Sequence, residues 1–409
     1  MQRRLFLLIF LSVILVQRVR AVLPPFNYAE NGTGPIALTL DSLLTDPLLD
    51  VSQVGLMVYD LTADSALYCH GHRQTLRPAS TMKLVTAITA LDCLGSNYRF
   101  TTMLSTAGRI VGRTLHGDVY CIGGMDPLLS NDDLQSFVES LREQGIDSVA
   151  GHLVTDLTMK DTLRYGEGWC WDDDNPLLSP LSVERHTDVA QRLLSRLLAD
   201  DIVFTNNDNV VTTYNDVVRI GAAPDSAEMV AVRWHTISQV LMPMMKRSDN
   251  FYAEALYYQV AASASTRSAR AADARLRERE LLSRVGVATG TYRLADGSGL
   301  SLYNYLSADI LVRLLRYAWL NPEIQATLLP SLPVAAIDGT LKSRMAGTAA
   351  AGNVRAKTGT LTGVSSLAGY CIAANGHQLC FAIINQGALR AAAARALQDS
   401  ICDALCRQK

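Results

Sequence analysis

The chain has 409 residues, of which 49% are hydrophobic and 19% charged, and its formal net charge at pH 7 is −2. This length exceeds the size at which one hydrophobic core usually stops growing, so we expect more than one structural unit. The apolar content excludes an intrinsically disordered chain. There are 37 basic and 39 acidic residues and no basic block of the kind that binds nucleic-acid phosphates, so nucleic acid is not an expected partner.

The N-terminus has the pattern of a secretory signal peptide. Arg3 and Arg4 precede the apolar run 5–16, and the small residue Ala21 suits a cleavage site. We therefore expect residues 1–21 to be a signal peptide and the product to be exported to the periplasm. The apolar run is short for a bilayer span, and an uncleaved anchor is the alternative. Loose association with a membrane surface and the oligomeric state stay open.

Export makes the eight cysteines candidates for disulfides, and one pair has suggestive spacing. An Asn-Gly two-residue turn at 375–376 would place Cys371 opposite Cys380 on one sheet face, where a disulfide could form. Directly paired strand cysteines tend to be strained, so two free thiols are the alternative. His70 and His72 could share a strand face, but no third ligand follows at a convincing spacing, and no metal site is expected.

The predicted elements fall into three successive parts. Alternating residues predict a strand hairpin first, and helical spacing then predicts a helix that begins near Ser80 and ends at Gly95. From about residue 99 to 224 the pattern changes to short strands, turns and one helix, which indicates a separate unit. Helices return after residue 236, before a strand-rich stretch and a last helix. The main expected elements are strands 54–61, 66–70 and 117–122, helices 132–144, 251–262 and 307–319, strands within 354–385, and helix 391–406.

Ser80-Thr81-Met82-Lys83 places a hydroxyl and an amine three residues apart at the start of a helix, on one face and within mutual reach. Serine needs a neighbouring base to act as a nucleophile, and a lysine can serve if burial or a nearby cation keeps it neutral. A helix-capping serine followed by a surface lysine is the ordinary alternative. The chain uses 31 arginines and only six lysines, and arginine cannot become neutral, so a lysine at position 83 favours catalysis, although a coding bias gives the same skew.

Two further motifs follow in the chain. Ser248-Asp249-Asn250 precedes a predicted helix and offers a second hydroxyl and an amide, although alone it is a helix cap. Lys357-Thr358-Gly359-Thr360 lies in a predicted strand, where glycine lets a substrate backbone approach, although alone it is an ordinary strand. SxxK, SDN and KTG in this order are the motif set of class A β-lactamases and penicillin-binding proteins.

With these motifs the sequence resembles the class C low-molecular-mass penicillin-binding proteins, which are D-alanyl-D-alanine carboxypeptidases and endopeptidases. The resemblance implies an α+β fold: a transpeptidase-like domain, a five-stranded antiparallel sheet between helices, in residues 22–98 and 225–409, interrupted by an inserted accessory domain in residues 99–224. Only 168 positions separate Ser80 from Ser248, which is short for the class, so part of the insert is expected to be reduced. Four more segments are similar to family signatures: Gly117 through Pro127, Gly168–Asp173, Asp296–Ser301 and Asp338–Leu341.

The same resemblance implies catalytic roles. Ser80 would attack the carbonyl between two D-alanines and form an acyl-enzyme, with Lys83 as its base. Lys357 would keep positive potential over the site. Ser248 would relay a proton to the leaving amine, and Asn250 would hold the acyl chain.

Substrate binding is implied in the third motif. Thr358 and Thr360 would bind the terminal carboxylate beside Gly359, and the backbone N–H groups of Ser80 and Thr360 would bind the oxyanion. Asp249 is expected to hold its loop. No cofactor is required. The implied partners are peptidoglycan stem peptides, with β-lactam antibiotics as covalent inhibitors.

Two other functions fit the same motifs. A serine β-lactamase needs in addition a carboxylate that activates the deacylating water, and its usual ExxLN sequence is absent from this chain. A noncatalytic module that binds β-lactams or cell wall is the second alternative. The intact Ser80, Lys83, Ser248 and Lys357 argue against it.

Overall fold

The structure is a computed structural model that describes residues 24–28, 34–173, 175–206, 209–264 and 268–409. The predicted signal peptide lies outside these residues. Within them, no helix combines the length and the apolar character needed to cross a bilayer.

The larger of two units is built on a five-stranded antiparallel sheet in the order β11-β12-β13-β1-β2. The N-terminal hairpin β1-β2 and the C-terminal strands meet where β1 pairs with β13. Distant parts of the chain therefore form one sheet, and the predicted hairpin and C-terminal strands are confirmed. The strands are β1 Gln53–Asp60, β2 Ser65–His70, β11 Arg355–Leu361, β12 Val364–Ile372 and β13 Gln378–Gln386.

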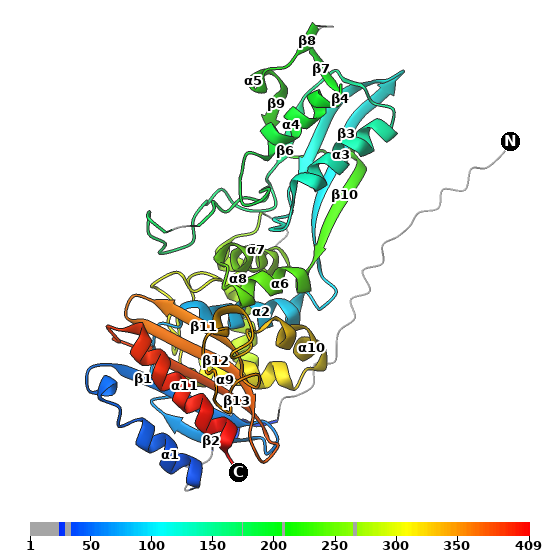
Figure 1. Cartoon of the computed structure of the whole chain (residues 1–409). Coiled ribbons are helices and arrows are strands. Elements are labelled where there is room, and N and C mark those ends of the chain that lie inside the picture. Colours follow the sequence, from blue (N-terminus) through cyan, green and yellow to red (C-terminus); the bar gives the residue numbers. More distant parts are fainter. Residues whose placement is uncertain (1–23, 29–33, 174, 207–208, 265–267) are drawn as a thin grey trace, which may run out of the picture.

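Helices cover both faces of this sheet (Figure 1). Leu40 of α1 and Leu397 of α11 share one core with the sheet residue Phe381, whereas Ile88 of α2 and Leu311 of α9 lie in the core of the other face. The predicted sheet between helices is thus confirmed. The helices of this unit are α1 Pro35–Leu43, α2 Met82–Cys93, α6 Ile237–Lys246, α7 Asn250–Ala262, α8 Ala271–Arg284, α9 Ala308–Trp319, α10 Pro322–Ser331 and α11 Ala391–Arg407, with short 3₁₀ helices η1 Pro47–Asp50, η2 Ala79–Thr81 and η3 Gly339–Leu341.

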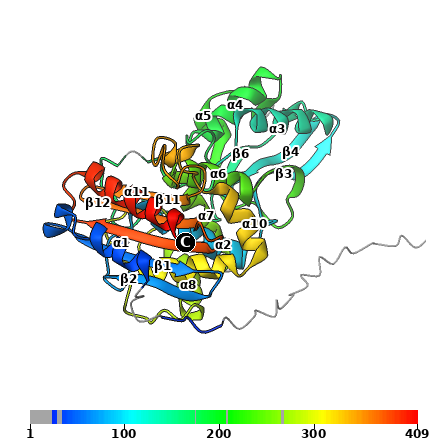
Figure 2. The same cartoon turned by 60° about the horizontal axis from the view of Figure 1, so that its bottom comes forward.

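The second unit contains a mixed eight-stranded sheet and stands at one end of the molecule, beyond α6 and α7 (Figures 1 and 2). Its strand β10 follows residue 224 and pairs with β3, so we propose that the inserted unit runs from 99 to 236. Its elements are β3 Arg99–Val111, β4 Thr114–Ile122, α3 Asn131–Glu143, β5 Ser148–Val149, β6 Leu153–Asp156, α4 Val189–Ala199, β7 Val203–Asn206, β8 Asn209–Val211, α5 Tyr214–Val217, β9 Val218–Ile220 and β10 Glu228–Thr236.

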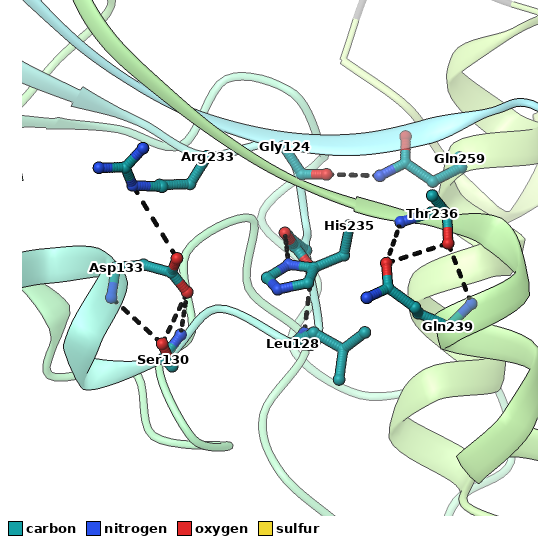
Figure 3. A network of polar contacts seen from close by, with 10 residues as sticks. Gly124, Leu128, Ser130, Asp133, Arg233, His235, Thr236, Gln239 and Gln259 are labelled. Atoms are coloured by element: carbon teal, nitrogen blue, oxygen red, sulfur yellow. Dashed lines mark hydrogen bonds and ion pairs between the residues drawn. The ribbon is translucent and has the colours of Figure 1, made fainter. Parts of the chain in front are cut away.

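Polar contacts join the two units where β3 and β10 meet the helices (Figure 3). The amide of Gln259 on α7 donates to the Gly124 carbonyl of the inserted unit, and it accepts a hydrogen bond at 2.6 Å from the hydroxyl of Tyr98, the residue directly before that unit. β10 continues directly into α6, which begins with a capping box between Thr236 and Gln239. These contacts give the inserted unit a defined position above the helices.

His235 in this network should make stability depend on pH. Its Nδ1 lies 2.7 Å from Oδ2 of the buried Asp126, and this hydrogen bond raises the pKa of His235 above its usual 6.5. A raised folded-state pKa contributes stability that is fully present below pH 6.5 and lost as pH rises through the raised value. We therefore expect His235→Asn to lower Tm more at pH 6 than at pH 9 in thermal denaturation, whereas the exposed control His116→Asn changes little at either pH. An equal loss at both pH values would contradict this assignment.

The expected opposition of Cys371 and Cys380 is wrong by one residue. The Ala373 N–H donates to the His377 carbonyl, so three residues form the hairpin loop where two were expected. Cys371 therefore pairs with Leu379, and Cys380 lies opposite Tyr370. A shift of one residue turns the two side chains to opposite faces of the sheet, so they cannot form a disulfide. All eight cysteines are free thiols.

Candidate active site

Ser80 lies in η2, directly before helix α2. The residue before it, Ala79, has a φ of +48°, in the left-handed region that costs a non-glycine residue about 1–3 kcal/mol. Gly299 packs against this turn, and a Cβ at position 299 would lie 1.9 Å from the Ala79 carbonyl oxygen. Only glycine at 299 is compatible with the turn that presents Ser80.

The Lys83 amine is fully buried on the first turn of α2 and has three oxygen neighbours. Its Nζ lies 3.0 Å from Ser80 Oγ, 2.6 Å from Asn250 Oδ1 and 2.7 Å from the Ser298 carbonyl oxygen. Burial lowers the pKa of Lys83 to about 8, against the opposing effect of nearby carboxylates, chiefly Asp296. The first and second predicted motifs thus meet at this amine.

The second motif forms the entry to helix α7. Ser248 has a φ of +61°, and Asp249 caps the helix by accepting a hydrogen bond from the Phe251 N–H at 3.0 Å. The other oxygen of Asp249 accepts from the Arg185 guanidinium of the inserted unit at 2.7 Å. Asp249 therefore holds this loop from two sides, while Asn250 begins the helix next to Lys83.

The third motif lies on β11, an edge strand of the sheet. Lys357 is fully buried, and its Nζ donates to Ser248 Oγ at 2.8 Å and to the Thr358 carbonyl at 2.6 Å. Burial, with a smaller effect of the Lys83 charge, holds the pKa of Lys357 well below its usual value. A Cβ on Gly359 would lie 2.9 Å from the Ser80 backbone nitrogen, so glycine permits the strand to approach the serine turn.

The threonines of the third motif occupy the more exposed side of the same strand. Thr358 is partly exposed, and its hydroxyl donates to Thr340 Oγ1 at 2.8 Å. Thr360 is exposed and accepts a hydrogen bond from Nη2 of Arg395 at 3.3 Å. The structure thus gathers the three sequence motifs around one site. Among the residues that the structure describes, no three His, Cys, Asp or Glu side chains lie together so as to hold a metal ion.

Sequence reasoning gave no role to the buried Asp296, which organises the loop behind Lys83. Its carboxylate accepts five hydrogen bonds at 2.7–3.2 Å, which hold the loop that presents the Ser298 carbonyl to the amine. In the sequence, only the similarity of the segment Asp296–Ser301 to a family signature points to this loop. The donors are Trp169 Nε1, Ser298 Oγ, Gly299 N, Ser301 N and Asn304 Nδ2.

Glu254 is the second residue that the sequence reasoning missed. Its Oε1 accepts hydrogen bonds from the N–H groups of Gly297 and Ser298 at 3.0 and 2.8 Å. Burial, followed by the charge of Asp296, raises the pKa of Glu254 to about 8. Position 254 follows Asn250 by four residues on α7, so both side chains lie on the same face of the helix. This spacing was the signal in the sequence that Glu254 lies near the second motif.

Residues 36–184 and 196–408 match the model of the D-Ala-D-Ala carboxypeptidase 3 (S13) family. The chain belongs to this family. The D-alanyl-D-alanine carboxypeptidase of Actinomadura sp. is 32% identical, over 88% of this chain and 82% of that protein. The D-alanyl-D-alanine carboxypeptidase DacB of Haemophilus influenzae is 26% identical, over 83% of this chain and 86% of that protein.

Solved structures share the fold. Penicillin binding protein 4 from Haemophilus influenzae superposes with a TM-score of 0.76 at 23% identity, over 89% of this chain and 97% of that chain. A predatory peptidoglycan endopeptidase from Bdellovibrio bacteriovorus superposes with a TM-score of 0.54 at 18% identity, over 82% of this chain and 86% of that chain. The predicted family, the fold class and a serine-type DD-peptidase as the kind of enzyme are confirmed.

Proposed function

We propose that this protein hydrolyses peptidoglycan stem peptides between their two terminal D-alanines through an acyl-enzyme on Ser80, and cleaves peptide cross-links as a second activity. Membership of a D-Ala-D-Ala carboxypeptidase family supports the substrate class. The observation that carries the proposal is the 3.0 Å contact between Ser80 Oγ and the buried amine of Lys83. A serine becomes nucleophilic when a base of this kind can take its proton.

Lys83 is the proposed base. A neutral amine has two N–H donors and one lone pair. Asn250 Oδ1 and the Ser298 carbonyl each accept one N–H, which directs the lone pair toward Ser80 Oγ. The serine hydroxyl then donates to the amine and transfers its proton as the oxygen attacks. Burial supports this role, because a pKa of about 8 leaves a useful fraction of Lys83 neutral near neutral pH.

Ser248 is proposed to deliver a proton to the leaving amine. Its oxygen accepts a hydrogen bond from Lys357 at 2.8 Å, so its own proton is available to the leaving amine on the opposite side. The protonated Lys357 amine then returns a proton to the Ser248 oxygen along the same hydrogen bond. Asn250 uses Oδ1 for Lys83, and its NH₂ group is the part that can donate to a carbonyl of the bound acyl chain. The first two motifs would thus act on both sides of the scissile bond.

The open edge of β11 is proposed to bind the substrate backbone and the oxyanion. The Ala356 N–H donates to the Pro333 carbonyl at 3.0 Å, on the side of β11 away from β12. N–H groups alternate sides along a strand, so those of Thr358 and Thr360 point to this same edge. The N–H groups of Thr360 and Ser80 are therefore the proposed oxyanion donors, and fixed donors of this kind are usually the largest catalytic contribution in acyl transfer.

Two assays on the purified full chain test this function. In the first, a stem peptide that ends in D-Ala-D-Ala should release free D-alanine, and a cross-linked dimer should yield monomers. In the second, intact-protein mass spectrometry should show a long-lived benzylpenicillin adduct that peptide mapping assigns to Ser80. The adduct persists because the opened ring keeps the leaving group tethered in the site, where it obstructs water.

Each other outcome points elsewhere. Rapid return of the unmodified mass while hydrolysed drug accumulates indicates a β-lactamase. A stable adduct without D-alanine release or cross-link cleavage indicates a noncatalytic binding module. An adduct on another residue overturns the assignment of the nucleophile.

Replacing Glu254 should change how stability depends on pH. A carboxyl whose folded-state pKa is raised from 4.5 to about 8 contributes stability that is present below pH 4.5 and lost as pH rises toward 8 and beyond. Glu254→Gln keeps an acceptor for the two N–H groups and removes this titration, so Tm should fall less between pH 5 and pH 9 than in the parent protein. Glu280→Gln, at a more exposed position on α8, is the control. If Tm falls as much between pH 5 and pH 9 in the Glu254 variant as in the parent protein, the raised pKa of Glu254 is refuted.

We further propose that the protein is exported to the periplasm, with a mature chain that begins near Val22. The N-terminal charge and apolar pattern supports this localisation. N-terminal sequencing of the functional protein from its native host tests it, and retention of Met1 would contradict it.

A further inference from the structure

A guanidinium lies beside the threonines of the third motif. Arg395 is exposed near the start of α11, and its Nη2 donates to Thr360 Oγ1 at 3.3 Å. Thr358 lies two positions earlier on β11, so its side chain is on the same face of the strand. Two hydroxyls and one permanent positive charge therefore gather at one end of the proposed site.

The usual intrahelical partner of this arginine is already occupied. Asp399 follows Arg395 by four residues, the spacing at which helix ion pairs form. Arg344 instead binds Asp399 through Nε at 2.9 Å and Nη2 at 2.6 Å, and it also donates to the Arg395 carbonyl at 3.2 Å. None of the acidic side chains that the structure describes lies within ion-pair distance of the Arg395 guanidinium. Its backbone is fixed, and its charge is available to a ligand.

The lysine of the same motif is less suited to this contact. Lys357 is fully buried and already donates to Ser248 and to the Thr358 carbonyl. Its pKa is held well below the usual value, whereas arginine keeps its charge at every physiological pH and presents paired donors that match a carboxylate. Among the cations near Thr358 and Thr360, Arg395 therefore has the chemistry that a carboxylate requires.

We propose that Arg395 binds the free carboxylate of the substrate's leaving residue, together with the hydroxyls of Thr358 and Thr360, and so determines the preference for substrates that end in a carboxylate. This inference rests on the proposed function. A hydrogen bond to a charged group is typically worth about 1.5–3 kcal/mol, which corresponds to about 10- to 150-fold in kcat/KM.

Two thioester substrates that differ only in a leaving group ending in carboxylate or in carboxamide test this proposal on the full chain. Thioesters are reactive enough for both rates to be measured. Arg395→Ala should lower kcat/KM for the carboxylate substrate at least tenfold, whereas kcat/KM for the carboxamide substrate should stay within about twofold of the parent value. The variant should also show a weaker dependence of the carboxylate reaction on salt concentration. Arg395→Lys should restore part of the loss.

Arg407→Ala is the matched control, because Arg407 is exposed at the other end of α11 and pairs with Asp403. Equal losses on both substrates, or carboxylate activity within twofold of the parent, would overturn the role of Arg395. The proposed function is judged separately, because it fails if the parent protein neither releases D-alanine nor cleaves a cross-link.

Discussion

Ser80→Ala should abolish peptide hydrolysis, with a fall in kcat of at least ~10³-fold in an assay of released D-alanine. The Ser80 hydroxyl is the one that Lys83 contacts, at 3.0 Å, whereas Ser248 contacts Lys357. Without Oγ no acyl-enzyme can form, so penicillin should leave the mass of the variant unchanged. Loss of one hydroxyl from a short 3₁₀ turn should leave the fold intact.

Two comparisons make this result specific. Ser263→Ala removes an exposed hydroxyl just after α7 and should retain parental activity. Thermal denaturation should give nearly the same Tm for both variants and the parent. Turnover or a penicillin adduct in Ser80→Ala at parental levels would mean that another residue is the nucleophile.

The elements and the order of the motifs could be predicted from the sequence because both depend on local signals. Helical spacing predicted a helix over 391–406, and α11 runs from Ala391 to Arg407. The SxxK spacing predicted that the side chains of Ser80 and Lys83 would meet, because both lie on one turn at the start of a helix. The family resemblance supplied the rest of the site, which spans residues far apart in the chain.

The features that the sequence did not predict depend on tertiary packing or on a single residue of register. One extra loop residue moved Cys371 to the face opposite Cys380, although the Asn-Gly signal for a turn was correct. Acidic side chains are usually exposed, so the sequence favours a surface position for Asp296 and Glu254. Both are instead buried behind Lys83 and hydrogen-bonded to one loop. Arg395 reaches Thr360 only because α11 packs across the sheet.

Lys83→Arg should be nearly as damaging as loss of Ser80, again by at least ~10³-fold, although it preserves a positive charge. A guanidinium stays protonated in proteins and cannot accept the serine proton. The amine also sits in a closed space with three oxygen atoms at 2.6–3.0 Å, where the larger group adds strain of about 1–3 kcal/mol. Lys83→Met, which has similar length and no charge, should lose as much activity without that overpacking. Lys342→Arg, at an exposed position, is the control and should remain active.

The pH profile separates the role of Lys83 as base from a merely structural role. The base must be neutral, so kcat/KM of the parent should increase with pH and level off above about pH 8. At lower pH kcat/KM should decrease, because the Lys83 amine becomes protonated. The residual activity of Lys83→Arg and Lys83→Met should show no such rise, because the titrating group is gone. Near-native activity in the arginine variant, or the same acidic limb in either variant, would refute Lys83 as the base and would transfer that role to another group at the site.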